Sequence, residues 1–109
     1  MGIAKKYDND KPRTDLLPTK ALMAIASIYG FGAAKYDEWN WANGFKWSRL
    51  YGAVLRHLFA WSAGETLDSE SNKSHLLHAA CGLLMLIEHE IRNIGKDDRY
   101  DWRREQTED

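Results

Sequence analysis

The segment from Leu76 to Ile87 constrains the fold of this chain more than any other. Drawn as a helix, it is apolar on nearly every side, with His78 as the exception. A helix of this kind lies at the centre of a domain or at an interface between chains. We therefore expect an all-α fold built around this segment, and the remaining sequence shows no strand pattern that competes with it.

Helical periodicity and capping signals divide the chain into an extended arm, three helices and a tail. The arm, residues 1–18, holds both prolines, and each proline disfavours helix in the residue before it. We expect Leu16 and Leu17 to anchor this arm to the core. The first expected helix spans about 19–36 with Thr19 as N-cap, and the second spans about 48–63 with Ser48 as cap. The third begins at Asn72 or Ser74 and ends at Asn93 or Ile94, with Gly95 as C-cap. The charged tail covers residues 96–109.

Length and composition bound the class of protein. A chain of 109 residues makes one domain, so we expect a single helical domain, residues 1–109. A net charge of −1 argues against a polymer of nucleic acid as partner. The longest apolar run, residues 79–87, is far below the ~20 residues that a membrane span needs. The single Cys81 suits a reducing compartment, and we expect a cytoplasmic protein.

Three helices make a small bundle, and they would leave the apolar third helix half exposed. We therefore expect oligomerisation to complete the bundle, most simply as a homodimer with two-fold symmetry, with a homotetramer as the alternative.

Histidines and carboxylates form the first candidate site. His75 and His78 share one face at the start of the third helix, and His57 lies on the apolar face of the second. If these helices are antiparallel neighbours, His57 and His78 approach each other near the connecting loop. That loop carries three acidic residues, Glu65, Asp68 and Glu70. Such a group can hold a divalent metal and activate water. The alternative is a pair of hydrogen-bonded core histidines beside a solvated acidic turn, whereas His89, between Glu88 and Glu90, is interpreted as a surface residue.

Cations and aromatic side chains form two further groups. Lys11, Arg13, Lys35 and Arg56 could neutralise phosphate, although Arg56 could equally pair with the acidic loop. The loop at 37–47 carries several aromatic residues and two asparagines. It could form a lid on the bundle, a contact between chains, or a nucleobase platform in which Tyr36 or Trp41 stacks on the base and Asn40 or Asn43 reads its edge.

Short motifs in a fixed order cover about residues 8–88. They are Lys11-Pro12-Arg13 with Leu16-Leu17-Pro18, Phe31-Gly32-Ala33 with Lys35-Tyr36, Asn40-Trp41 with Gly44, Arg56-His57-Leu58 with Trp61, Gly64-Glu65 with Asp68 and Glu70, and His75-Leu76 with His78-Ala79-Ala80. In this order they resemble a phage-encoded family, the N-terminal domain of dATP/dGTP diphosphohydrolases. That family is similar to the all-α, MazG-like nucleoside triphosphate pyrophosphohydrolases, which cut the α–β phosphate bond with divalent cations held by helix carboxylates.

The chain departs from the MazG-like pattern in its metal ligands. Its second helix carries no carboxylate, and His75-x-x-His78 stands where the third helix would offer acids. Mg²⁺ prefers oxygen ligands, so a histidine-rich site suits Mn²⁺, Fe²⁺ or Zn²⁺ better.

The resemblance implies a nucleotide pyrophosphohydrolase acting on purine deoxynucleoside triphosphates in the cytoplasm of an infected bacterium. We expect Glu65, Asp68, Glu70 and His78 in catalysis. The expected metal ligands, for Mg²⁺ or Mn²⁺ with Fe²⁺ or Zn²⁺ as alternatives, are His57, His75, His78, Asp68 and Glu70. The expected substrate-binding residues are Lys11, Arg13, Lys35, Tyr36, Asn40, Trp41 and Arg56. Two alternatives stay open: a non-catalytic protein that sequesters a nucleotide, including a nucleotide signal of host immunity, and a protein-interaction module built on the tryptophan loop.

Overall fold

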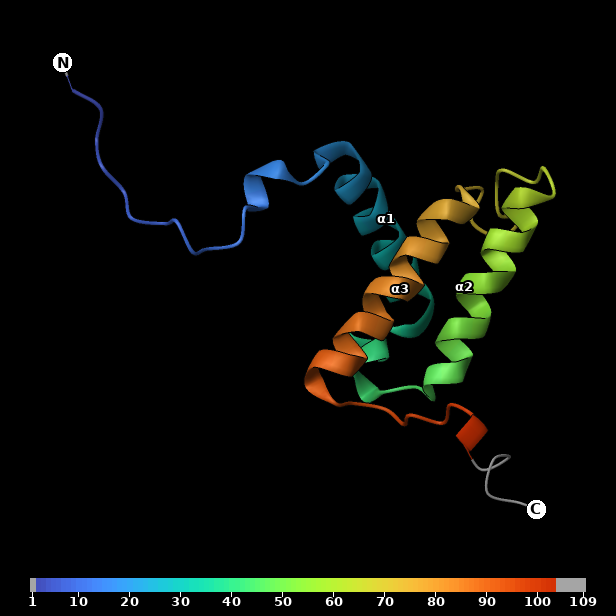
Figure 1. The fold of residues 1–109 in the computed structure, drawn as a ribbon. Coiled ribbons are helices and arrows are strands. Elements are labelled where there is room, and N and C mark those ends of the chain that lie inside the picture. Colours follow the sequence, from blue (N-terminus) through green and yellow to red (C-terminus); the bar gives the residue numbers. More distant parts are fainter. Residues whose placement is uncertain (1, 104–109) are drawn as a thin grey trace.

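The computed structural model describes residues 2–103 of the chain. The elements are η1 (Thr14–Leu16), α1 (Thr19–Tyr36), η2 (Asn40–Asn43), α2 (Trp47–Ser62) and α3 (His75–Arg92), as Figure 1 shows. Within residues 2–103 the structure has no strand beyond two isolated bridge pairs, Lys46 with Lys96 and Leu67 with Ser74. The prediction of an all-α fold with three main helices is confirmed.

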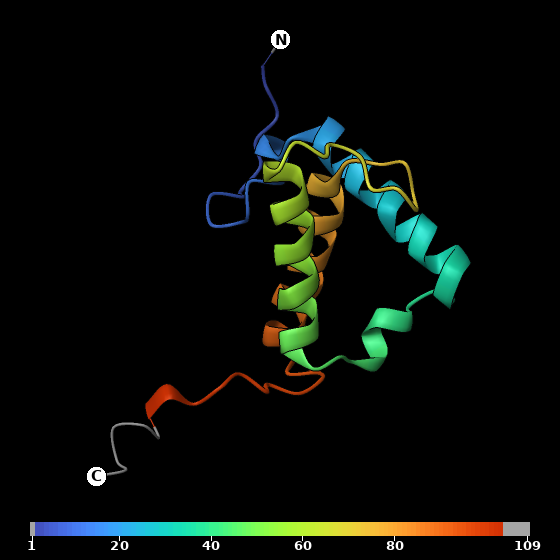
Figure 2. The same ribbon diagram turned by 90° about the vertical axis from the view of Figure 1, so that its right-hand side faces the viewer.

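The core lies where α3 packs between the other two helices. α2 and α3 run antiparallel and side by side in both views (Figures 1 and 2), and α3 packs more extensively against α2 than against α1. Gly82 allows the close approach of α2, because a Cβ at that position would lie 2.9 Å from a methyl carbon of Val54. On the other side of α3, the Tyr29 hydroxyl of α1 donates to the Cys81 carbonyl at 3.3 Å.

The helix ends follow ordinary capping chemistry. Ser74 caps α3, its hydroxyl accepting from the Leu76 N–H at 3.1 Å. The C-cap of α3 is Asn93, which takes the left-handed conformation that asparagine tolerates, and not Gly95 as predicted. Thr19 and Ser48 were expected as caps, but Pro18 and Lys46 occupy those positions, a shift of one or two residues.

The arm does not pack against the core of its own chain. Leu16 and Leu17 are 69% and 49% exposed, so their predicted role as anchors is wrong for the single chain. The reason is local, since Leu17 and Pro18 both have extended backbone that carries the arm away from the start of α1. Figure 1 shows the arm projecting from the bundle, which gives the molecule a longest dimension of 74 Å.

The exposed apolar surface of α3 bears on the predicted oligomerisation. Within the described residues, α3 exposes five large apolar side chains, Leu76, Leu83, Leu84, Ile87 and Ile91. The association of copies through such a surface stays a prediction. In the tail, the rings of Tyr100 and Trp102 contact each other at a centroid distance of 4.4 Å, and residues 104–109 lie outside the described part. None of the helices in the part that the structure describes is long and apolar enough to cross a membrane.

Candidate functional site

A cavity of about 600 Å³ lies among the second half of α1, the loop with η2, and the facing sides of α2 and α3. This volume falls within the range of small-molecule sites. One part of its wall is aromatic, and the other carries titratable side chains. The aromatic lining residues are Tyr29, Phe31, Tyr36, Trp39, Trp41 and Phe45. The ionisable groups in the lining include Lys35, His57, Asp68, Glu70 and His78.

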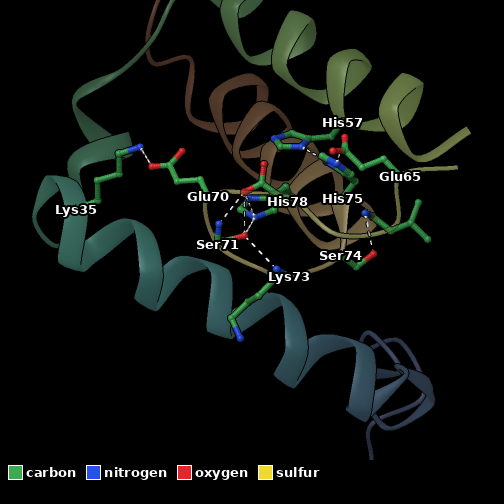
Figure 3. A network of polar contacts seen from close by, with 11 residues as sticks. Lys35, His57, Glu65, Glu70, Ser71, Lys73, Ser74, His75 and His78 are labelled. Atoms are coloured by element: carbon green, nitrogen blue, oxygen red, sulfur yellow. Dashed lines mark hydrogen bonds and ion pairs between the residues drawn. The ribbon is translucent and has the colours of Figure 1, made fainter. Parts of the chain in front are cut away.

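His57 and His75 face each other through their Nδ1 atoms. The two Nδ1 atoms are 2.9 Å apart, one contributed by the middle of α2 and the other by the first residue of α3 (Figure 3). The other ring nitrogen of His75, Nε2, is 2.9 Å from a carboxylate oxygen of Glu65. A carboxylate only accepts, so His75 Nε2 carries a proton, and in the neutral ring Nδ1 presents its lone pair toward His57. Glu65 therefore fixes the tautomer and the orientation of His75.

Asp68, Ser71 and His78 form a second network beside the first. The Ser71 N–H and hydroxyl both donate to Asp68 Oδ2, at 2.9 and 3.0 Å. The same hydroxyl oxygen lies 2.6 Å from His78 Nε2 and accepts the Lys73 N–H at 3.2 Å. Because the Ser71 hydroxyl donates its hydrogen to Asp68, its oxygen accepts the hydrogen bond from the N–H at His78 Nε2. One oxygen thus links His78 to the carboxylate, and Figure 3 shows Ser71 beside His78.

The two networks touch through stacked imidazoles. The rings of His57 and His78 have centroids 4.8 Å apart and planes inclined by only 12°. The predicted approach of these two histidines, from antiparallel helices, is therefore confirmed. The ligand atoms of His57, His75 and Asp68 all lie within 4.8 Å of one another.

The environment favours the neutral forms of His57 and His78 and the ionised form of Asp68. Burial lowers the pKa of His57 below its ordinary value of 6.5, and the neighbouring His78 and His75 lower it further. Burial also lowers the pKa of His78, although Asp68 opposes this shift. Burial raises the pKa of Asp68, but the two hydrogen bonds from Ser71 oppose this shift, and with the electrostatic influence of the nearby imidazoles they lower the pKa overall. Neutral imidazole and ionised carboxylate are the forms that bind metal.

Lys35 and Glu70, both in the lining of the cavity, form an ion pair that joins α1 to the loop before α3 (Figure 3). Both side chains are substantially exposed, so the pair is an adaptable one that adds little to stability. Hydrogen bonds to Glu70 and to Tyr36 raise the pKa of Lys35, which keeps its ammonium charged. Glu70 thus points toward Lys35, away from the histidines.

The structure brings most of the predicted site residues together. Eight of them line the cavity: Lys35, Tyr36, Asn40, Trp41, His57, Asp68, Glu70 and His78. Glu65 and His75 stand behind this wall and contact it through His57.

Three predicted cations lie elsewhere. Lys11 and Arg13 are on the exposed arm, where the Arg13 guanidinium donates twice to Asp15, each at 2.9 Å. Arg56 is exposed because one residue along α2 turns it about 100° away from His57. Within residues 2–103 it pairs with no carboxylate, so the predicted alternative of an ion pair with the acidic loop is not observed.

Two residues near the site were not predicted correctly from the sequence. Ser71 was not predicted, although an Asp68-x-x-Ser71 spacing before a helix is typical of a side-chain-stabilised turn. His89 was interpreted as a surface residue, and this is wrong, because its side chain is fully buried. It lies eleven residues after His78, close to three helical turns, so both histidines share one face of α3.

A second, larger cavity of about 920 Å³ lies between the C-terminal segment and the adjoining ends of α2 and α3. Its cations are already matched, since Arg99 pairs with Asp97 at 2.6 Å and Arg103 with Asp101 at 3.0 Å. It gathers no histidine among its lining residues. The smaller cavity is therefore the candidate site.

The donor set of this site suits a divalent transition metal. Neighbouring ligand atoms on one ion lie roughly 3.0–3.4 Å apart, from octahedral to tetrahedral geometry, when the bonds are about 2.1 Å. The two Nδ1 atoms, at 2.9 Å, are close to this range. Nitrogen donors with one carboxylate favour Mn²⁺, Fe²⁺ or Zn²⁺ over Mg²⁺. The contact of Glu65 with His75 is the kind of outer contact that orients a metal-binding imidazole.

Fold and site together define a class: an all-α protein in which one cavity joins an aromatic wall to a cluster of histidines and carboxylates. The chain belongs to the family described as dATP/dGTP diphosphohydrolase, N-terminal, which matches residues 2–99. The resemblance inferred from the sequence motifs is thereby confirmed.

One relative is a protein of Salmonella phage PMBT28 that bears the name dATP/dGTP diphosphohydrolase. It is 32% identical to this chain over 82 residues, which make up 75% of this chain and 28% of the relative. The chain thus spans little more than a quarter of that protein's length. No solved structure matches the chain.

Proposed function

We propose that the chain binds a purine deoxynucleoside triphosphate in the cavity and, with a divalent metal, hydrolyses it to the monophosphate and pyrophosphate. The observation that carries this proposal is the joining of an aromatic wall and a histidine–carboxylate cluster within one cavity of nucleotide size. The name of the phage relative supports the choice of dATP and dGTP as substrates.

The aromatic wall is the base end of the proposed site. Trp41 is half-buried and Tyr36 is exposed at the cavity, so each offers a ring face to a purine. Stacking of this kind contributes about 1–3 kcal/mol per base. Asn40 lies beside them in the lining and can donate and accept toward a base edge.

The polar end would hold the phosphates. The Lys35 ammonium can move from Glu70 to a phosphate oxygen with little loss of stability, because both partners are partly in solvent. Glu70 would then be free to take part in the reaction or to contact the metal. His57, His75 and Asp68 are the residues that would hold a metal ion, with Glu65 fixing His75. When bound, such an ion supplies positive charge for the transferred phosphate and lowers the pKa of a water molecule.

His78 has the features of a proton acceptor. Its pKa is lowered, so the ring is neutral, and it lies against the cluster through its stacking on His57. Ser71 and Asp68 hold Nε2 with its proton, which leaves Nδ1 to accept one. The imidazolium so formed would be stabilised by the Asp68 carboxylate, 3.7 Å from Nε2.

Product analysis tests this function. Purified protein is incubated with dATP or dGTP in Mn²⁺ or in Mg²⁺, denatured, and the soluble fraction is separated by chromatography. We expect monophosphate and pyrophosphate, with Mn²⁺ more effective than Mg²⁺. His78→Ala should lower the rate by at least ~100-fold, the size of a general acid–base contribution, with the helical content unchanged. Glu90→Gln, on an exposed position of α3, is the matched control and should keep the wild-type rate.

Two results would refute parts of the proposal. Full activity in excess chelator would exclude a metal, and full activity in His78→Ala would exclude the assigned site. A second function, sequestration of a nucleotide without turnover, is favoured by the lack of any carboxylate on α2. Its signature is a nucleotide that binds tightly without metal and is recovered chemically unchanged.

A further inference from the structure

His89 is the most buried large side chain in the described part of the chain, with an exposed fraction of 0%. It is also polar, and both of its ring nitrogens have partners. Nε2 accepts the backbone N–H of Phe45 at 3.1 Å, and Nδ1 lies 2.7 Å from the Met85 carbonyl oxygen. Because Nε2 accepts, the proton is on Nδ1, which donates to Met85. The ring is thus held as one neutral tautomer.

Three residues that contact or neighbour the His89 ring belong to the wall of the candidate site. Met85, Trp41 and Phe45 line the cavity, whereas His89 itself stands behind them. The imidazole lies 6.4 Å from the Trp41 ring and 6.3 Å from the Phe45 ring, nearly parallel to the latter. His89 therefore joins the aromatic loop to α3 at the base end of the cavity.

The chain around this contact is built for close approach. Gly44 and Gly95 have positive φ, and a Cβ on Gly95 would lie 2.2 Å from the Phe45 carbonyl oxygen. Two backbone hydrogen bonds cross the same junction: the Lys96 N–H donates to Phe45 O at 3.1 Å, and the Trp47 N–H to Lys96 O at 2.9 Å. These contacts hold the loop in place within a few residues of Trp41, and His89 adds a side-chain hydrogen bond to it from α3.

We propose that His89 is a positioning residue for base recognition, which sets the place of Trp41 and Phe45 against the purine. This inference rests on the proposed function. An apolar side chain would fill the same space but leave the Phe45 N–H without its acceptor. The position of the loop relative to the cavity would then no longer be fixed. Glutamine can replace both contacts, because its amide accepts through oxygen and donates through nitrogen.

Two ligands separate this role from a general role in folding. dGTP engages both ends of the proposed site, whereas inorganic triphosphate engages only the polar end. The dissociation constants of both are measured by tryptophan fluorescence, in the presence of Ca²⁺ to limit hydrolysis, for wild type, His89→Leu and His89→Gln. Glu90→Gln, the exposed neighbour on α3, serves as control.

We expect His89→Leu to raise the dissociation constant of dGTP by about tenfold or more, which is the effect of one lost buried hydrogen bond. The dissociation constant of triphosphate should stay unchanged. His89→Gln should bind dGTP within about threefold of wild type, since both hydrogen bonds can be kept. If the leucine variant does not fold, His89→Met carries the same test with a more flexible side chain.

Equal dGTP affinity in folded His89→Leu, or equal weakening of dGTP and triphosphate, would overturn the inference and leave the proposed function standing. A glutamine variant as weak as the leucine variant would also overturn it. Wild-type protein that binds neither dGTP nor triphosphate would remove the proposed function, and this inference with it.

Discussion

Gly95→Ala should destabilise the fold much more than Gly64→Ala, although both glycines have positive φ. The two φ angles are +72° at Gly95 and +99° at Gly64, so alanine is strained at both. They differ in the space around the new methyl group. At Gly64 nothing lies within 4 Å, whereas at Gly95 the Phe45 carbonyl oxygen would be at 2.2 Å and a ring carbon of His89 at 2.8 Å.

The magnitude follows from these contacts. Forcing alanine into the left-handed region costs about 1–2 kcal/mol at either site. At Gly95 the backbone must also shift, and it would break the hydrogen bonds that Lys96 makes with Phe45 and Trp47, each of which contributes about 1 kcal/mol. We therefore expect a loss of about 3–4 kcal/mol for Gly95→Ala, against about 1–2 kcal/mol for Gly64→Ala.

Urea unfolding, followed by tryptophan fluorescence and by circular dichroism, measures this difference in the free energy of unfolding. In thermal unfolding, a difference of about 2 kcal/mol corresponds to a difference of about 8–16 °C in Tm for a domain of this size. Equal losses in the two variants would refute the argument, because they would show that the junction of the loop with α3 is not as close as the structure places it.

Two further predictions concern the histidine cluster. Glu65→Ala should weaken Mn²⁺ binding about 10- to 100-fold in isothermal titration, because His75 loses the partner that fixes its tautomer, and an unchanged affinity would contradict this. The pKa values of His57 and His78 are lowered below 6.5 in the folded chain, so the unfolded chain takes up protons first as the pH falls. The free energy of unfolding without metal should therefore decrease as the pH falls below about 6.5, and equal values at pH 7.5 and 5.5 would contradict the burial of these rings.

Helical periodicity made the main features of the site predictable. The spacing of apolar residues placed His57 on the inner face of one helix and His78 on the inner face of the next. Taking the two helices as antiparallel neighbours in a small bundle was enough to predict their approach. The distance of 4.8 Å between the rings bears out this reasoning.

Other features depend on backbone geometry that spacing does not reveal. Ser71 enters the site only because the chain turns at Asp68, which brings a hydroxyl between a carboxylate and His78. His89 is flanked by two glutamates, a pattern typical of a surface position, yet the loop containing Phe45 folds over it. Whether a polar residue on a helix is exposed depends on what a distant loop covers.

The two ends of the cavity are held by different parts of the molecule. The histidine end depends on the packing of α2 against α3, where Gly82 lets Val54 approach closely. The aromatic end depends on the junction of the loop with the end of α3, through His89 and Gly95. Since the two supports are made by different residues, changes at one end should affect the other weakly. Base recognition and metal binding are therefore expected to be separable by mutation, and a relative with another base preference would differ first in the loop and at the position of His89.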